Sequence, residues 1–334
     1  MILFLCEQDD ESARLVAEAL TRRGQRVVTF DHGRYPAEAA ISVRTSRTDG
    51  WRAELRGPAG SFFLSDVRAA YVRSLGMPRA STAVTDPLVR SYLVAEAREH
   101  LYDLWAALRS HGCFWLPGAP NDLGPAQRKV DQLARAQRLG LAVPDTLMSN
   151  DPEAVLEFHR AHEGRAVSKL VGSALPTVGR GRVLRYTERL RSRDLHDLDG
   201  VRVGPTIYQA LVPKAYEVRA TVVGGRVLAA AIDSQATNRT RVDWRRYDLG
   251  HTPHRAIQLP VSVESRLVAL CRSFGLSYGA IDLIVTPEGE HVFLELNPAG
   301  QWQWIEQMTG LPISDAIADE LEAGATRVAT GAVA

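Results

Sequence analysis

The stretch that decides the fold is GAIDLI at residues 279–284, followed by TPEG at 286–289 and HVFLELNP at 291–298. Two apolar runs joined by a short segment with Pro and Gly predict an antiparallel hairpin, with strands over 280–285 and 290–296. Each strand carries one acid within apolar sequence, Asp282 in the first and Glu295 in the second. Such acids need a partner or a ligand.

The two acids can face a common site. Inward side chains on paired antiparallel strands lie about 4.5–5.5 Å apart, and Asn297, two residues beyond Glu295, shares the face of Glu295. Two carboxylates and an amide oxygen form an all-oxygen set suited to Mg²⁺ that also holds substrate phosphates. A metal ion would also remove the cost of burying unpaired acids. The alternative is an edge hairpin with two solvated acids.

Composition limits the other possibilities. The 334 residues exceed the size of one growing core, so we expect two or three lobes. The formal net charge of +1 gives no electrostatic argument for nucleic acid or an anionic membrane. Three widely spaced cysteines indicate a reducing compartment, and neither a signal peptide nor a membrane-spanning run is seen. These features predict a soluble cytoplasmic protein.

The chain is organised in three parts. Apolar strands over 2–6 and 27–30 flank a helical pattern over 12–20, which predicts a strand–helix–strand unit and a parallel sheet. Turn residues at 117–121 mark the first boundary, and a helix is predicted over 126–139. The last third is antiparallel, with a second hairpin over 217–232 that turns at two glycines.

Isolated lysines upstream of the hairpin are candidate phosphate ligands. Lys169 ends a strand and precedes a Gly-containing loop over 172–181, which can bind phosphate through a point charge and backbone N–H groups. Lys129 lies in the helix over 126–139. A solvated lysine is the alternative at both positions.

Two extended segments are candidates for the rest of a nucleotide. The backbone of residues 208–213 can meet an adenine edge, although an ordinary strand between lobes is equally consistent. Glu217 and Arg219 alternate on one strand face, where an acid for a ribose hydroxyl and a cation for a phosphate can share a site. A cross-strand ion pair is the alternative. Two other kinds of machinery are missing, since neither a GxxxxGK[ST] nor an HExxH pattern occurs.

Taken in order, these segments resemble the ATP-grasp superfamily, and within it the graspetide synthetases related to microviridin ligases. The resemblance runs nearly end to end and is most specific in the last motif. The residues that carry it are Lys129, Leu133 to Thr146, Ser149 to Pro152, Gln209 to Val212, Lys214, Glu217, Arg219, Asp243 to Arg245, Phe293 to Glu306 and Gly310 to Ile313.

The resemblance implies an ATP-grasp fold, α/β and α+β in class, with a Rossmann-like N-terminal domain over 1–118, a central lobe over 119–208 and a C-terminal lobe over 209–334. Its site residues, carried over by position, are Lys129 and Lys169 on the phosphates, Gln209, Ala210, Leu211 and Val212 at the adenine, Glu217 at the ribose, Asp282, Glu295 and Asn297 on Mg²⁺, and Arg219 near the γ-phosphate and the substrate carboxylate. Glu217 stands where many relatives have Asp.

The implied activity is ATP- and Mg²⁺-dependent activation of carboxylates in a precursor peptide as acyl phosphates, followed by ester or amide ring closure. A homodimer is expected. The leader of the precursor is expected to bind an Arg-rich segment containing Arg239, Arg241 and Arg245; a solvated loop is the alternative there. Two other functions stay open, a ligase for free amino acids or small acids and a nucleotide-binding regulator without turnover.

Overall fold

Four short apolar runs build a parallel sheet in the first 116 residues, as the strand–helix–strand pattern predicts. Every residue of β1 and β6 is buried, which is typical of strands covered on both faces. Helix α1 crosses from β1 to β2, and Asp10 caps its first turn. The sheet order is β2-β1-β6-β7, all parallel, with β1 (Ile2–Leu5), α1 (Glu11–Arg22), β2 (Val27–Phe30), β6 (Ala69–Val72) and β7 (Phe114–Leu116). We call this sheet and its helices the N-terminal lobe.

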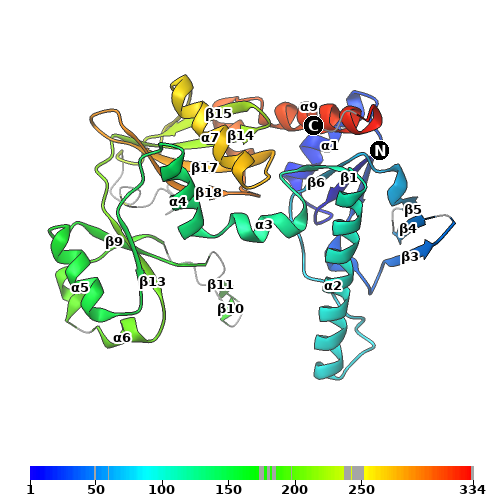
Figure 1. Ribbon diagram of the computed structural model, residues 1–334, viewed down its shortest axis with the longest axis horizontal. Helices are drawn as coiled ribbons and strands as arrows, with labels where there is room; N and C mark the ends of the chain where they lie inside the picture. Colours follow the sequence, from blue (N-terminus) through cyan, green and yellow to red (C-terminus); the bar gives the residue numbers. More distant parts are fainter. Residues whose placement is uncertain are drawn as a thin grey trace.

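The computed structural model describes residues 1–331 apart from positions 49, 59, 173–176, 179–180, 183–185, 197, 237–241 and 243–251. An antiparallel three-stranded sheet extends from the N-terminal lobe, and the long helix α2 projects beyond the parallel sheet (Figure 1). These elements are η1 (His32–Arg34), β3 (Ala40–Ser46), β4 (Gly50–Gly57), β5 (Gly60–Phe63), η2 (Leu64–Asp66) and α2 (Pro87–Ser110).

The connection between lobes differs from the prediction. The sequence suggests turn residues at 117–121 and one helix over 126–139, but the chain forms two helices, α3 (Pro120–Ala126) and α4 (Lys129–Arg138). Pro120 stands at the start of α3, where its missing N–H costs no hydrogen bond, so a proline here begins a helix rather than excluding one. The break places Lys129 at the first position of α4.

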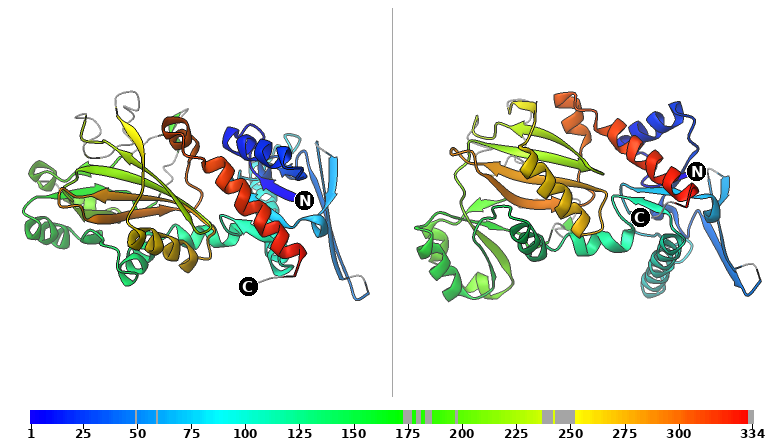
Figure 2. Two further views of the ribbon diagram at one scale, coloured as in Figure 1. Left: turned by 90° about the horizontal axis from the view of Figure 1, so that it is seen from above. Right: turned by 45° about the horizontal axis from the view of Figure 1, so that its top comes forward.

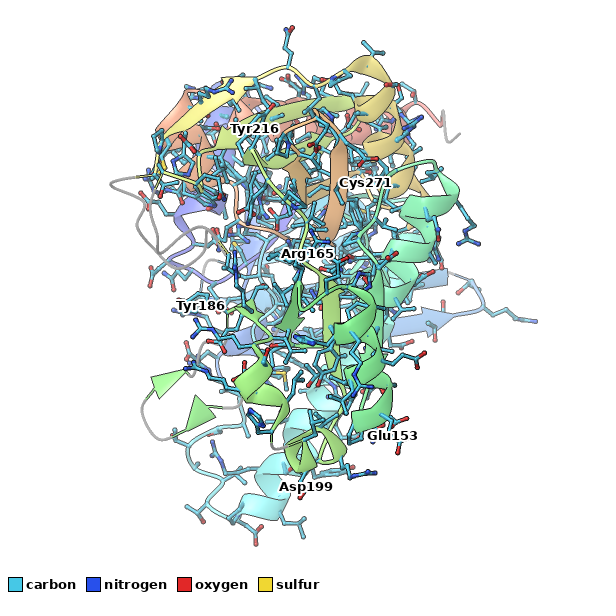
Figure 3. The ribbon with its side chains drawn as sticks, turned by 90° about the vertical axis from the view of Figure 1, so that its left-hand side faces the viewer. Glu153, Arg165, Tyr186, Asp199, Tyr216 and Cys271 are labelled. Atoms are coloured by element: carbon cyan, nitrogen blue, oxygen red, sulfur yellow. The ribbon has the colours of Figure 1, made fainter. Side chains whose placement is uncertain are left out.

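A second lobe surrounds a four-stranded antiparallel sheet of order β12-β9-β13-β8. We call it the central lobe. In Figure 3, Glu153 and Asp199 lie at its far end, and Arg165 lies between them and Tyr216 of the next lobe. Its elements are β8 (Thr146–Ser149), α5 (Pro152–Ala161), β9 (Ala166–Lys169), β10 (Thr177–Val178), β11 (Gly181–Arg182), β12 (Glu188–Arg189), η3 (Ser192–Leu195), α6 (Asp199–Arg202) and β13 (Thr206–Ala210).

The C-terminal lobe contains both predicted hairpins in one antiparallel sheet of order β16-β15-β14-β17-β18. Helix α9 leaves this lobe and packs against α1, β6 and β7, so the end of the chain lies beside its beginning (Figure 2). The elements are β14 (Tyr216–Val223), β15 (Arg226–Ile232), β16 (His254–Ile257), α7 (Val261–Ser273), β17 (Tyr278–Val285), β18 (His291–Asn297), α8 (Gln303–Thr309) and α9 (Ile313–Ala329).

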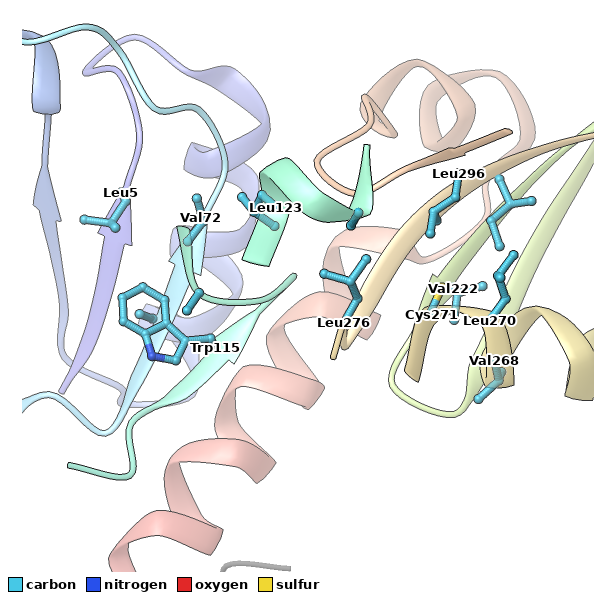
Figure 4. Close-up of a cluster of buried hydrophobic side chains, with 14 of the residues drawn as sticks. Leu5, Val72, Trp115, Leu123, Val222, Val268, Leu270, Cys271, Leu276 and Leu296 are labelled. Carbon is cyan, nitrogen blue, oxygen red and sulfur yellow. The ribbon is translucent and has the colours of Figure 1, made fainter. Parts of the chain in front are cut away.

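One hydrophobic cluster joins the N-terminal and C-terminal lobes. It runs from Leu5 and Trp115 of the parallel sheet, through Leu123 of α3, to Leu276 and Leu296 beside β17 and β18 (Figure 4). Burial of apolar side chains across the junction fixes the relative position of the two sheets. The three-part division made from the sequence stays a prediction. Helix α9, which that division assigns to the C-terminal lobe, packs on the N-terminal lobe. Within the described part of the chain, no helix is long and apolar enough to cross a membrane.

Candidate active site

The hairpin of β17 and β18 brings the two predicted acids together. Asp282 is directly opposite Glu295, and Ala280 is opposite Asn297. The register then shifts, so that Leu283 pairs with Phe293 and Leu294 is the extra residue of a β-bulge. Because of the bulge, Leu294 and Glu295 both line the same cavity, which strict alternation along a strand would prevent.

Each acid is paired with a cation from another element. Arg219 of β14, opposite Asp282 in the sheet, donates from Nη1 to both carboxylate oxygens of Asp282 at 2.9 and 3.1 Å. Both side chains are almost fully buried, with exposures of 6% and 8%. Glu295 accepts from Lys129 Nζ at the edge of the cavity. The alternative of two solvated acids is therefore wrong for Asp282.

Gln132 holds α4 against β18, the strand that carries Glu295 and Asn297. Its side chain accepts from the N–H of Leu296 at 2.9 Å and donates to the carbonyl of Leu296 at 2.7 Å. These two bonds fix the helix that begins at Lys129 next to Glu295, the neighbour of Leu296. The sequence analysis missed Gln132, whose only signal was a buried amide on the apolar side of a short helix.

A cavity of about 760 Å³ opens between the central and C-terminal lobes. It is lined by ten of the residues predicted to bind nucleotide or metal, namely Lys129, Lys169, Gln209, Ala210, Leu211, Val212, Glu217, Asp282, Glu295 and Asn297. Arg219 does not line it and lies behind Asp282. Arg239, Arg241 and Arg245 lie outside the described residues, so the predicted leader-binding segment stays a prediction.

Part of the cavity wall is apolar. Met148 and Val167 of the central lobe and Ile284 and Leu294 of the C-terminal lobe line it, beside the segment Gln209 to Val212. These four side chains come from both sheets, so a flat apolar ring can be held between them. The sequence analysis did not single them out, because their strand patterns are those of ordinary core residues.

The segment Gln209 to Val212 has fewer available backbone groups than expected. The N–H of Ala210 donates to Asp145 O at 2.9 Å, and the N–H of Leu211 donates to Arg165 O at 2.8 Å. The N–H of Val212 makes no hydrogen bond within the part of the chain that the structure describes. Val212 is therefore the N–H donor that this segment can offer to an adenine edge.

Glu217 is paired with Lys214, a residue to which the sequence analysis gave no role. Lys214 Nζ donates to Glu217 Oε1 at 2.7 Å, and both side chains line the cavity. Burial raises the pKa of the Glu217 carboxyl above its usual 4.5, and the charge of Lys214 opposes that rise. Of the expected alternative, a cross-strand ion pair, Arg219 forms one with Asp282 of β17, whereas Glu217 is paired with Lys214.

The donor set fits a hard cation. Asn297 Nδ2 donates to Asp282 Oδ2 at 3.3 Å, so the amide oxygen is the atom left for a ligand. Among the described residues no three His, Cys, Asp or Glu side chains converge, so the protein supplies two carboxylates and one amide. Mg²⁺ takes few protein ligands when phosphate oxygens complete its shell, which this set allows.

Comparison with known proteins identifies the family. Residues 1–121 match the family model described as the MvdD pre-ATP grasp domain. Macrocyclase MdnC from Microcystis aeruginosa MRC, solved with its precursor peptide MdnA, is 30% identical over 96% of this chain and 99% of MdnC, with a TM-score of 0.83. This chain belongs to the ATP-grasp peptide ligases.

Two further ATP-grasp ligases have the same architecture. The Chryseobacterium gregarium RiPP-associated ligase, solved with ADP and a leader and core peptide, is 27% identical over 96% of each chain, with a TM-score of 0.87. Ligase PsnB, solved with a minimal precursor, Mg and ADP, is 25% identical over 97% of each chain, with a TM-score of 0.75. No curated protein sequence matches this chain.

Family and fold were thus predicted correctly from the sequence, and the protein is an ATP-grasp ligase with a pre-ATP-grasp domain at its N-terminus. The roles given to single residues remain predictions. The structure adds two constraints to them. Lys129, Lys214 and Arg219 are already paired with Glu295, Glu217 and Asp282, and Arg219 is bonded to Asp282 and to the carbonyl of Gln301 rather than lining the cavity.

Proposed function

We propose that this ATP-grasp ligase uses ATP and Mg²⁺ to activate Asp or Glu side chains of a ribosomally made precursor peptide, and then closes ester or amide rings. The observation that carries the proposal is the cavity in which Asp282, Glu295 and Asn297 meet Lys129 and Lys169. It occurs in a chain that aligns over 96% of its length with a peptide macrocyclase.

In the orientation that we propose for ATP, the adenine would lie against the apolar side chains beside Val212 and the ribose near Glu217. The phosphates would then lie toward Asp282 and Glu295. Lys129 and Lys169 are among the cations that line the cavity wall. Mg²⁺, when bound, neutralises the phosphate oxygens and the two carboxylates together.

The reaction follows from where the charges lie. A peptide carboxylate oxygen attacks the γ-phosphorus, the bond to the β-phosphate oxygen breaks, and ADP leaves with an acyl phosphate formed. A Thr or Ser hydroxyl or a Lys amine then attacks the acyl carbon, loses its proton, and releases phosphate. Lys129 is free to follow the phosphates once its bond to Glu295 is released, and Arg219, already held by Asp282, stays fixed.

Water has to be excluded while the acyl phosphate exists. The cavity walls come from two sheets joined at Gln209 to Val212, so closure of the central lobe onto the C-terminal lobe would seal it. The lining residues Lys169 and Met148 belong to the central lobe, whereas Asp282 and Glu295 belong to the C-terminal lobe.

The partner is proposed to have two parts, a leader that is recognised and a core that is modified. ATP and one carboxylate account for the site residues, so affinity for the peptide must come from elsewhere. The Arg239, Arg241 and Arg245 segment remains our candidate for leader binding, and a homodimer remains the expected assembly. Neither nucleic acid nor a membrane is an expected partner.

The test is mass spectrometry of a short Thr- and acid-rich peptide encoded beside this gene, incubated with enzyme, ATP and Mg²⁺. Each ring should lower the peptide mass by one water and release one ADP and one phosphate. Formation of AMP and pyrophosphate would show adenylation and overturn the acyl-phosphate path. ADP release with free amino acids, and none with the peptide, would move the substrate class to small acids.

A further inference from the structure

Three successive backbone carbonyls directly after β18 accept hydrogen bonds from three side chains that come from separate parts of the chain. The segment is Ala299 to Gln301, which directly follows Asn297-Pro298, and its first two residues line the cavity. The bonds are Arg73 Nη1 to Ala299 O (3.4 Å), Tyr278 Oη to Gly300 O (2.7 Å) and Arg219 Nη2 to Gln301 O (3.0 Å).

Arg73 is the member of this set that comes from the N-terminal lobe. It follows β6, and its side chain is 6% exposed. Its Nε forms an ion pair with Asp10 Oδ2 at 3.6 Å and, among the residues that the structure describes, has no hydrogen-bond partner. A buried guanidinium is costly unless its donors are used. Its Nη1 donates across the lobe junction to the carbonyl of Ala299.

The middle of the segment has no room for a side chain. A Cβ added to Gly300 would lie 2.6 Å from Ala280 Cβ and 2.8 Å from Arg219 Nη2. Ala280 is the residue opposite Asn297 in the sheet. The backbone at Gly300 therefore packs directly on β17 and on the guanidinium that holds Asp282.

The segment links the two arginines. Arg73 binds its first carbonyl, Arg219 binds its third, and Arg219 donates with its other Nη to Asp282. A shift of Ala299 away from Arg73 would carry Gln301 with it and change where Arg219 and Asp282 lie. Each guanidinium also has a carboxylate beside it, Asp10 for Arg73 and Asp282 for Arg219, which offsets the cost of burying its charge.

We propose that Arg73 is a positioning residue for the metal and phosphate end of the site, acting from the N-terminal lobe through the segment Ala299 to Gln301. It touches neither nucleotide nor metal. Its effect is to hold this segment, and through it Arg219, in the place that lets Asp282 and Asn297 face one ligand. This inference rests on the proposed function for the identity of that ligand.

The experiment compares Arg73→Ala and Arg73→Lys with a matched control, Arg90→Ala. Arg90 also donates to backbone carbonyls, those of Ser81 and Val84 at 2.8 and 2.9 Å, but entirely within the N-terminal lobe. Three quantities are measured for each variant: amide hydrogen exchange of a peptide covering residues 297–303, calorimetric binding of ADP at a series of Mg²⁺ concentrations, and ADP release with peptide substrate.

In Arg73→Ala the amide hydrogen of Gly300 should exchange faster than in wild type. In the structure this amide donates to Asn297 O at 3.1 Å. The Mg²⁺ concentration for half-maximal ADP binding should rise about tenfold, the scale seen when a group that orients a ligand is removed. Arg73→Lys, which keeps the charge and one donor, should lie between. Arg90→Ala should match wild type in exchange and in Mg²⁺ dependence.

The outcomes separate two failures. If Arg73→Ala and Arg73→Lys match Arg90→Ala in exchange and in Mg²⁺ dependence, the positioning role is refuted, whatever the turnover. Should Arg73→Ala fail to fold, Arg73→Lys decides by the same two measurements. If wild type shows no ATP-dependent product while the exchange difference persists, the proposed function fails and the positioning role stands.

Discussion

Removing Asp282 and removing Glu295 should have different effects on the fold, although both acids are predicted to bind the same metal. The sequence alone treats them as equivalent, and suggests that either alanine variant would lose activity and keep its fold. The structure separates them. Asp282 neutralises a guanidinium that is 6% exposed, whereas Glu295 and Lys129 keep exposures of 18% and 23%.

The magnitude follows from what each substitution leaves behind. In Asp282→Ala the charge of Arg219 stays buried without its carboxylate, and breaking such a pair typically costs about 3–5 kcal/mol. Since 1 kcal/mol lowers Tm by about 2–4 °C in a domain of 150–250 residues, the variant should melt roughly 10 °C below wild type. In Glu295→Ala the lost pair is partly solvated and contributes about 0–1 kcal/mol, so Tm should change little.

The assay combines thermal unfolding by circular dichroism with phosphate release. Both single variants should lose ADP formation. A third variant, Asp282→Ala/Arg219→Met, removes both charges and keeps an apolar side chain of similar length, so it should regain most of the lost Tm without regaining activity. That recovery distinguishes an uncompensated charge from a cavity left by the missing side chain.

Equal Tm values for Asp282→Ala and Glu295→Ala would refute the reasoning about Arg219. So would a double variant less stable than Asp282→Ala. Normal turnover in either single variant would remove the metal assignment itself, independently of the melting temperatures.

Three further predictions follow from single contacts. Gly300→Ala should lower both turnover and Tm, because the added Cβ has no space. The control is Gly200→Ala, whose Cβ would meet nothing within 4 Å and which should be neutral or slightly stabilising. Thermal melts and phosphate release of both variants test this prediction. Lys129→Met should weaken ADP binding in calorimetry with little change in Tm, since its ion pair is partly solvated; unchanged affinity would argue against a phosphate contact. Burial lowers the pKa of His32 from 6.5 to about 4. Between these two pH values the unfolded state therefore binds more protons than the folded state. The free energy of unfolding should be highest above pH 6.5 and fall by about 3 kcal/mol toward pH 4. The urea midpoint of unfolding, measured across this pH range, should fall with pH in wild type and fall less steeply in His32→Asn. The same pH dependence in both proteins would contradict the assignment to His32.

Much of the fold could be predicted because its local patterns agree with its tertiary structure. The βαβ start and both C-terminal hairpins were read correctly from apolar periodicity and turn residues. Helix α7 (Val261–Ser273) was not recognised, and the helix pair α3 and α4 was placed as one. In α3, Pro120 and Pro125 look like turn residues, and only their positions in the helix, set by the lobe junction, make them tolerable.

The site was predictable as a set of residues and not as a set of contacts. Asp282 and Glu295 stand out because acids in apolar strands are rare, and Glu217 and Arg219 because they alternate on a strand. Their partners depend on strand order, which the sequence does not state. In the sheet β14 lies beside β17, and this arrangement places Asp282 opposite Arg219, so that the two side chains pair.

The pairing has a consequence for how ligands bind. Lys129 with Glu295, Lys214 with Glu217, and Arg219 with Asp282 leave three of the site's acids and three of its cations already compensated. A nucleotide phosphate that draws Lys129 away would strip Glu295 of its counter-charge, at a cost that rises with burial. With Glu295 as a metal ligand, as predicted, Mg²⁺ arriving with the phosphates would supply that charge, so we expect nucleotide and metal to favour each other's binding. We expect the paired site to disfavour nucleotide without metal. It should also disfavour metal without nucleotide, because the cations already pair with the carboxylates.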